Sequence, residues 1–235
     1  MASADTKARI LDAAERLIAA RGYHAVSMRS IAEAADVPLA SVSYHFGTKE
    51  GLYSAIFERR MGPLYEKRDH ALDALMRAAA PGLPTLEEVL TTFMTPVIEV
   101  SRDPGRGGED FGRLMAEILN APEDERVLTT VRTHFDVIAV KMLKVLGAVL
   151  PTYPEADLVW AYQFMAGSML HIMANTGRLE RLSRGKCSAK DVDAIMKRLV
   201  PWVAAGIRSL DPALQKQRRR RTPKAAAEAA ATASG

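Results

Sequence analysis

Two serines, a tyrosine, a histidine and a lysine lie within a few positions of one another in the run Val37-Pro-Leu-Ala-Ser-Val-Ser-Tyr-His-Phe-Gly-Thr-Lys-Glu-Gly51. Serine hydroxyls beside an imidazole are the groups that a nucleophilic hydrolase uses. Small hydroxyl side chains bordered by an aromatic ring and a cation also suit a surface that enters a nucleic-acid groove. The rest of the sequence decides between these two kinds of chemistry.

The hydrolase interpretation needs an acid that orients the imidazole and a group that stabilises an oxyanion. Ser41 and Ser43 precede His45 on what reads as an exposed helix, and neither requirement is met beside them. The sequence also has no phosphate-binding loop, no dinucleotide fingerprint and no Glu-x-x-His pair at any of its five histidines. We therefore expect no enzyme, no catalytic residue, no metal site and no cofactor, with a small all-helical enzyme as an alternative.

Helical spacing dominates the chain, and the alternation typical of strands is essentially absent. A first helix is predicted over residues 5–21, and Ser27 is the expected N-cap of a short second helix. Thr48 is the expected N-cap of a fourth helix, which should end at Met61 because Gly62-Pro63 follows. Longer helices are predicted over residues 63–79, 86–101, 109–120, 123–150, 155–176 and 189–209.

The opening run supplies the third helix, whose inner face is centred on Val42 and whose opposite face is small and polar. The second helix is also amphipathic and is joined to the third by the tight turn Asp36-Val37. Two such helices form a helix-turn-helix, in which the second helix enters the major groove of DNA. The predicted DNA-binding residues are Ser27, Met28, Arg29, Leu39, Ala40, Ser41, Ser43, Tyr44, His45 and Lys49.

Residues 7–61 resemble the N-terminal domain of the TetR family of transcriptional regulators. The resemblance is carried by Arg9-Ile-Leu-Asp-Ala-Ala-Glu-Arg-Leu-Ile18, Arg21-Gly-Tyr23, Ser27-Met-Arg-Ser-Ile-Ala32 and Tyr44-His-Phe-Gly-Thr-Lys-Glu-Gly-Leu52. It implies a repressor that binds a pseudo-palindromic, double-stranded DNA operator as a homodimer and is released by a small-molecule effector. A ligand-independent helical DNA-binding protein is the alternative.

Three residues depart from the family pattern. Asp36 stands where the family usually has glycine, Pro38 replaces the usual capping serine, and Ser43 replaces the commoner aromatic residue. We expect Asp36 to adopt a positive φ, which aspartate tolerates at some cost. The run over residues 37–49, together with Ile56-Phe57 and Met61-Gly-Pro-Leu64, is similar to the PsrA-like subgroup, which includes regulators responsive to long-chain fatty acids.

The longer helices are rich in methionine and aromatic residues, and nine of the eleven methionines lie from Met61 onward. Such residues can line an adaptable ligand pocket, although at helical spacing they are usually plain core. Because the family resemblance implies a ligand, we predict a pocket for a small hydrophobic effector, which could be a fatty-acyl molecule. Its predicted lining is Phe93, Phe111, Met115, His134, Phe135, Phe164 and His171.

The last two predicted helices combine small residues with a continuous apolar stripe. This pattern suits packing within one subunit, or a four-helix bundle across a two-fold axis, and the family resemblance implies the bundle. The predicted dimer-interface residues are Ala161, Met165, Ser168, Met169, Ile195, Leu199 and Trp202.

The net charge of +4 says little about DNA binding, because residues 211–235 alone hold six basic and two acidic residues. DNA binding must therefore follow from the placement of charges. The single cysteine and the lack of a long apolar stretch predict a cytoplasmic protein with no membrane partner. We expect an all-α protein with a helix-turn-helix DNA-binding domain over residues 1–62, a helical ligand-binding and dimerisation domain over 63–210, and a disordered basic and Ala-rich tail over 211–235.

Overall fold

The structure is a computed structural model that describes residues 2–103, 108, 126–174 and 176–216. Within these ranges every regular element is a helix, which confirms the predicted all-α fold. The helix predicted over residues 109–120 lies outside the described residues. The helices are α1 (Ala2–Arg21), α2 (Met28–Ala35), α3 (Leu39–Phe46), α4 (Lys49–Ala79), α5 (Leu86–Val100), α7 (Arg126–Val149), α8 (Glu155–Met173), α9 (Arg178–Ser183) and α10 (Val192–Arg208).

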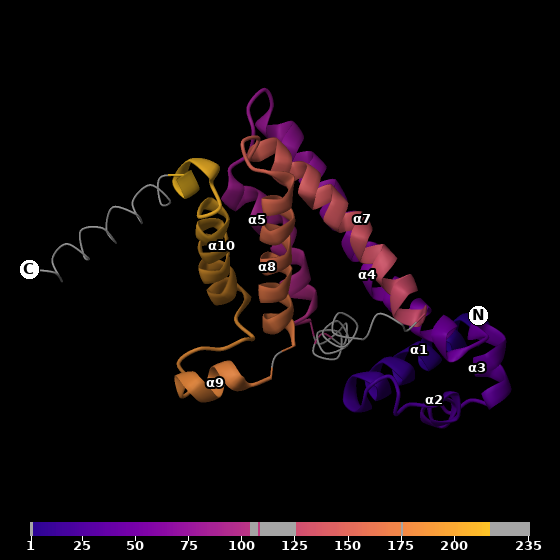
Figure 1. Cartoon of the computed structure of the whole chain (residues 1–235). Coiled ribbons are helices and arrows are strands. Elements are labelled where there is room, and N and C mark those ends of the chain that lie inside the picture. The colour runs from indigo at the N-terminus through magenta and orange to yellow at the C-terminus, as the bar shows by residue number, and fades with distance from the viewer. Residues whose placement is uncertain (1, 104–107, 109–125, 175, 217–235) are drawn as a thin grey trace, which may run out of the picture.

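The helices form a small unit and a larger bundle joined by one long helix (Figure 1). At one end of the molecule α2 packs against α1 and α3, which both contact α4, and α4 then runs beside α7 into the bundle. There α5 packs against α4 and α10, while α8 packs against α7 and α10. Helix α9 stands apart from this bundle. Buried apolar side chains form one continuous cluster from Ile10 in α1 to Ile207 in α10.

Local signals fix the helix-turn-helix as the sequence predicts. The Ser27 side chain accepts a hydrogen bond of 3.0 Å from the backbone N–H of Ser30, and so caps α2. Asp36 ends α2 at φ 53° and ψ 53°, which confirms the predicted left-handed conformation. Arg9 stabilises this turn, because its guanidinium donates to the carbonyl oxygens of Ala35 at 2.6 Å and Asp36 at 2.8 Å.

The junction between α3 and α4 fixes the direction of α3. Val42 and Phe46 on the inner face of α3 are buried. Thr48 caps α4 by accepting a hydrogen bond of 3.2 Å from the N–H of Gly51. A Cβ atom at Gly51 would lie 2.3 Å from the carbonyl oxygen of Phe46, so only glycine lets α4 approach the end of α3 this closely.

Helix α4 does not end at Met61, so the predicted break at Gly62-Pro63 is wrong. Pro63 lies inside a helix of 31 residues and is exposed, whereas Met61 and Leu64 on either side of it are buried at 3% exposure each. Packing of these two side chains holds the helix together, although Pro63 supplies no backbone N–H. The proposed domain boundary at residue 62 therefore falls inside a helix that both parts share.

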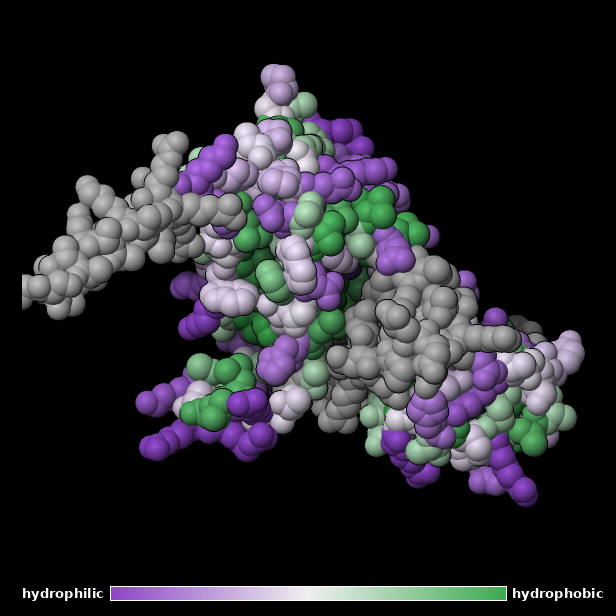
Figure 2. Space-filling view, viewed as in Figure 1, coloured by the Kyte–Doolittle hydropathy of each residue, from purple (hydrophilic) through white to green (hydrophobic). Residues whose placement is uncertain are grey.

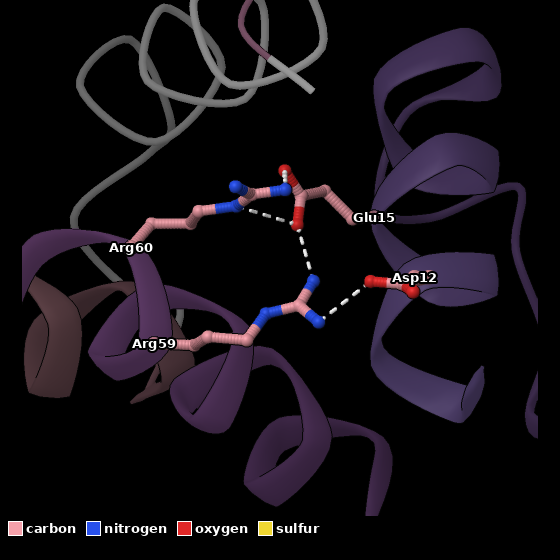
Figure 3. A network of polar contacts seen from close by, with 4 residues as sticks. All are labelled: Asp12, Glu15, Arg59 and Arg60. Carbon is pink, nitrogen blue, oxygen red and sulfur yellow. Dashed lines mark hydrogen bonds and ion pairs between the residues drawn. The ribbon is translucent and has the colours of Figure 1, made fainter. Parts of the chain in front are cut away.

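A cluster of ion pairs clamps α1 to α4 just before this boundary (Figure 3). The Glu15 carboxylate, with a side chain only 3% exposed, lies 2.6 Å from Arg59 and 2.8 Å from Arg60. Arg59 also pairs with Asp12 at 2.7 Å. The guanidinium groups come from consecutive residues of α4, and both carboxylates come from α1. A displacement of α4 in the bundle would therefore be passed to α1.

The bundle departs from the predicted elements in three places. Helix α5 begins as expected near residue 86, and Thr85 and Glu88 form a capping box at its start. Helix α10 begins at Val192 instead of residue 189, because the Asp191 carboxylate caps it by accepting from the Ala194 N–H at 2.9 Å. Helix α9 was not predicted, and residues 212–216 of the predicted tail are helical. Residues 217–235 lie outside the described residues, and within the described part no helix is long and apolar enough to cross a membrane.

Candidate nucleic-acid interface and its connection to the helical bundle

The outward face of α3 carries the predicted DNA-binding residues at the surface. Tyr44 is the most exposed large apolar side chain in the described part of the chain, at 83%. Leu39 is exposed at 46%, and Ala40 and Ser43 are exposed beside it. Of the remaining predicted residues, Ser27 and Arg29 are exposed, whereas Ser41, His45, Met28 and Lys49 are half-buried.

Aromatic contacts position Tyr44 on this face. Its ring meets the His45 ring edge-on, with centroids 5.2 Å apart. His45 in turn lies beside the ring of buried Phe46, at 6.1 Å. The phenol group of Tyr44 thus extends into solvent from a helix whose inner face is fixed, and it can stack on a base or hydrogen-bond to a phosphate.

The start of α4 presents the cation of Lys49 at a helix N-terminus, where Thr48 caps the N–H of Gly51. The Lys49 ammonium lies 4.1 Å from the ring centroid of Tyr23, a cation–π contact that holds it near this end. Glu50 places a negative charge beside it, and the pKa of Glu50 is lowered chiefly by a hydrogen bond from the backbone. A phosphate could pair with Lys49 at this end of the helix, where the helix dipole favours an anion, but Glu50 would oppose it.

The residues predicted for the effector pocket do not all face the interior of the bundle. Phe93 is buried at 1% exposure, between α4 and α8. Phe164 is 58% exposed and His171 is exposed, so both lie on the outer face of α8. The pocket remains a prediction. Phe111, Met115, His134 and Phe135 lie outside the residues whose side chains the structure describes.

Most residues predicted for the dimer interface lie instead inside one subunit. Trp202 is 65% exposed and Ser168 is half-buried. The interior residues are Ala161, Met165, Met169, Ile195 and Leu199. Two exposed aromatic side chains of α8, Trp160 and Phe164, come one position before the buried Ala161 and Met165, and their rings stack with centroids 5.6 Å apart. The interface itself remains a prediction. On α8, Ala161, Met165 and Met169 are buried within the subunit, and Ser168 is the predicted residue that reaches the surface.

A groove of about 730 Å³ separates α9 from the ends of α8 and α10. Its lining includes His171, Leu179, Leu182, Ile195, Leu199 and Trp202. A second, shallower hollow of about 710 Å³ runs along the outer face of α8 and shares His171 and Trp202 with the groove. Hydrophobic surface is visible over α9 and between α8 and α10 in Figure 2. The outer face of these helices is therefore an exposed apolar surface with hollows.

The sequence did not predict the burial of two charged residues, Glu15 of α1 and Arg68 of α4, and Arg68 is 4% exposed. Its guanidinium carbon lies 3.5 Å from the ring centroid of Phe93. The spacing could have revealed it, because Leu64, Arg68 and Leu72 recur every four residues on one helix face and the two leucines are core residues. Among the described residues, no cluster of side chains is suited to hold a metal ion.

Comparison with known proteins agrees with this arrangement. Residues 10–56 match the model of bacterial regulatory proteins of the tetR family, and residues 91–206 match that of the tetracyclin repressor-like C-terminal domain. The HTH-type transcriptional regulator AcrR of Shigella flexneri is 32% identical over 115 residues, which are 49% of this chain and 48% of AcrR. The match thus spans about half the length of that curated relative.

Solved structures share the fold across most of both chains. The fatty acid degradation regulator FadR from Bacillus halodurans superposes with a TM-score of 0.59 at 19% identity, over 83% of this chain and 96% of FadR. The structure of FadR from Bacillus subtilis in complex with stearoyl-CoA superposes with a TM-score of 0.57 at 18% identity, over 84% of this chain and 97% of that FadR. With both parts of the chain matched by its models, the protein belongs to the TetR family of transcriptional regulators.

Proposed function

We propose that this protein is a cytoplasmic, ligand-released repressor that binds a pseudo-palindromic operator as a homodimer. In this proposal residues 1–62 bind double-stranded DNA, residues 63–210 bind the effector and dimerise, and residues 211–235 form a basic tail. The observation that supports this proposal best is the outward face of α3. It presents small side chains and the 83% exposed Tyr44 on a helix whose inner face is locked by Val42 and Phe46.

DNA recognition would rest on shape as well as on hydrogen bonds. Ala40 and Ser43 allow the backbone of α3 to approach base edges closely, and the Ser43 hydroxyl can donate to them or accept from them. Tyr44 and Lys49 would hold the flanking phosphates and so fix the depth of α3 in the groove. A two-fold dimer would present two such helices about 34 Å apart, one turn of DNA, or at a multiple of that distance.

The exposed apolar face of α8 and α10 supports the proposed dimer. Trp160, Phe164 and Trp202 are each more than half exposed, and such a concentration of aromatic side chains is typical of protein interfaces. Trp202→Glu would place a charge in this face. We expect this variant to sediment as a monomer and Lys197→Glu, which alters an exposed polar position of the same helix, to remain dimeric. A dimeric Trp202→Glu protein would contradict this interface.

A hydrophobic effector suits the bundle interior, where buried methionine and aromatic side chains gather. Two observations favour the PsrA-like, fatty-acyl class: the likeness of residues 37–64 to that subgroup, and the fold shared with a regulator that binds stearoyl-CoA. Because α4 runs unbroken from Lys49 into the bundle, an effector that displaces it would also move α1 through Glu15. The two reading helices would then no longer match the operator spacing.

The DNA-binding part of the proposal is tested by selecting sequences from a random duplex library with the full-length protein, and then footprinting them. We expect a two-fold symmetric site with half-sites one or more helical turns apart. Tyr44→Ala should bind the selected sequence more weakly, whereas Lys197→Glu should bind it as tightly as the wild type. Occupation of a single asymmetric half-site by a monomer would contradict the proposal.

A further inference from the structure

Arg68 is a cation buried inside the bundle, and none of the described residues supplies it with an anion. Its side chain is 4% exposed, and its Nε–H has no hydrogen-bond partner. No carboxylate of the described residues forms an ion pair with it, although Arg9, Arg59, Arg60 and Arg208 all have such partners. Burial lowers the pKa of Arg68 to about 10, so the group is still charged at neutral pH.

Burial of an uncompensated guanidinium is costly, since the charge loses its hydration. The Phe93 ring, 3.5 Å from the guanidinium carbon, recovers only part of this cost through a cation–π contact. An apolar residue at position 68, between the core residues Leu64 and Leu72, would give a more stable core. A buried charge that does not serve stability is best explained by a ligand that pairs with it.

Two partly buried tyrosines lie close enough to Arg68 to interact with its charge. Tyr65 of α4 and Tyr162 of α8 have their pKa values raised by burial, so both phenols stay protonated and can donate hydrogen bonds. The charge of Arg68 acts on both of them, and Tyr162 meets the Phe93 ring edge-on at 6.2 Å. Among the described acids, Asp136 of α7 acts electrostatically on both tyrosines, and it is exposed. The cluster thus offers one cation and two neutral donors to an anion.

We propose that Arg68, with Tyr65 and Tyr162, holds the carboxylate of an amphipathic effector whose apolar chain lies among the buried side chains of the bundle. The buried methionines Met94, Met142, Met165 and Met169 suit such a chain. This inference rests on the proposed function as an effector-binding regulator. It narrows the effector to a free carboxylate, because a thioester presents a neutral carbonyl at that end and would leave Arg68 unpaired.

Ligands with different head groups and substitutions at residue 68 together test whether Arg68 holds the carboxylate. Isothermal titration of the full-length protein would compare oleate and laurate with their methyl esters and with oleoyl-CoA and lauroyl-CoA. Arg68→Met removes the charge at similar volume, Arg68→Lys retains a charge, and Arg77→Met changes an exposed arginine of the same helix. Arg68→Met should fold, since an apolar side chain replaces a buried charge.

We expect the wild-type protein to bind the carboxylates at least about tenfold tighter than the esters or thioesters, because the esters and thioesters cannot form the charge-assisted contact with Arg68. Arg68→Met should lower carboxylate affinity roughly a hundredfold and leave ester affinity unchanged. Arg68→Lys should keep part of the preference for carboxylate, and Arg77→Met all of it. If Arg68→Met does not fold, the head-group preferences of the wild-type and Arg68→Lys proteins decide the question.

Equal binding of carboxylate and ester by the wild-type protein would overturn the assignment, as would wild-type carboxylate affinity in Arg68→Met. Tighter binding of a thioester than of the free acid would also overturn it, while leaving the proposed acyl-responsive regulator in place. If the free dimer binds none of these molecules, the proposed effector function fails and the assignment fails with it.

Discussion

Neutralising Glu15 tests whether α4 is mechanically tied to α1. The Glu15 side chain is 3% exposed, and its two oxygens contact Arg59 at 2.6 Å and Arg60 at 2.8 and 2.9 Å. Glu15→Gln keeps the shape and one acceptor oxygen but removes the charge that both guanidinium groups share. The two arginines would then repel each other in a partly buried site.

The expected destabilisation follows from the exposure of the three groups. Removing one partner of a fully buried ion pair typically costs about 3–5 kcal/mol. Arg59 and Arg60 are 27% and 17% exposed, and Arg59 keeps its contact with Asp12, so water and Asp12 offset part of the loss. We therefore expect Glu15→Gln to lower the free energy of unfolding by about 2–3 kcal/mol. Asp12→Asn, at a side chain 54% exposed, should cost less than about 1 kcal/mol.

Urea unfolding at one fixed protein concentration measures both variants, since the stability of a dimer depends on concentration. Glu15→Gln should also weaken the coupling between sites. Effector would still bind the free protein, but it would release DNA less completely, because α4 could move without α1. A loss of stability in Glu15→Gln no larger than in Asp12→Asn would refute the reasoning that the clamp is a buried, cooperative cluster.

Three further variants test the interface and the scaffold. Tyr44→Ala should weaken operator binding in fluorescence anisotropy about tenfold to a hundredfold without changing helical content, and wild-type affinity would mean that this face does not meet DNA. Asp36→Gly should raise the free energy of unfolding by about 0.5–1 kcal/mol, since glycine adopts φ 53° without strain. The exposed Arg9–Asp36 ion pair, at 3.7 Å, adds little stability, and a lower melting temperature of Asp36→Gly would contradict this prediction. A hydrogen bond from Arg208 lowers the pKa of Glu87, so this pair stabilises the fold fully above the ordinary glutamate pKa of 4.5 and is lost as pH falls through the lowered value. Melting temperature should therefore fall more steeply on acidification in the wild type than in Glu87→Gln, and parallel pH profiles would argue against the pair.

Sequence patterns predicted the N-terminal unit well because its determinants are local. Ser27 and Thr48 cap the helices that follow them, and Asp36 takes the left-handed conformation that ends α2. Each of these depends on residues only a few positions away. The continuation of α4 through Pro63 could not be predicted in this way, since it depends on the core contacts of Met61 and Leu64.

The faces of α8 were harder to assign for a related reason. This helix is apolar on nearly every side, so its sequence does not show which side meets the core of one subunit. Met165 and Met169 turned out to face the core, whereas Phe164 and His171 face outward. Arg68 was overlooked although its spacing from Leu64 was visible, because an arginine within an apolar stripe is usually assigned to the surface.

The central claim is that effector and operator DNA compete through one conformational equilibrium, and reciprocal titration tests it most directly. Oleate would be titrated into the labelled protein–operator complex with release followed by anisotropy, and into free and DNA-bound protein by calorimetry. We predict that oleate releases the operator, and that the operator lowers oleate affinity by the same factor by which oleate lowers operator affinity. Equal oleate affinity for the free dimer and the DNA complex would contradict the account.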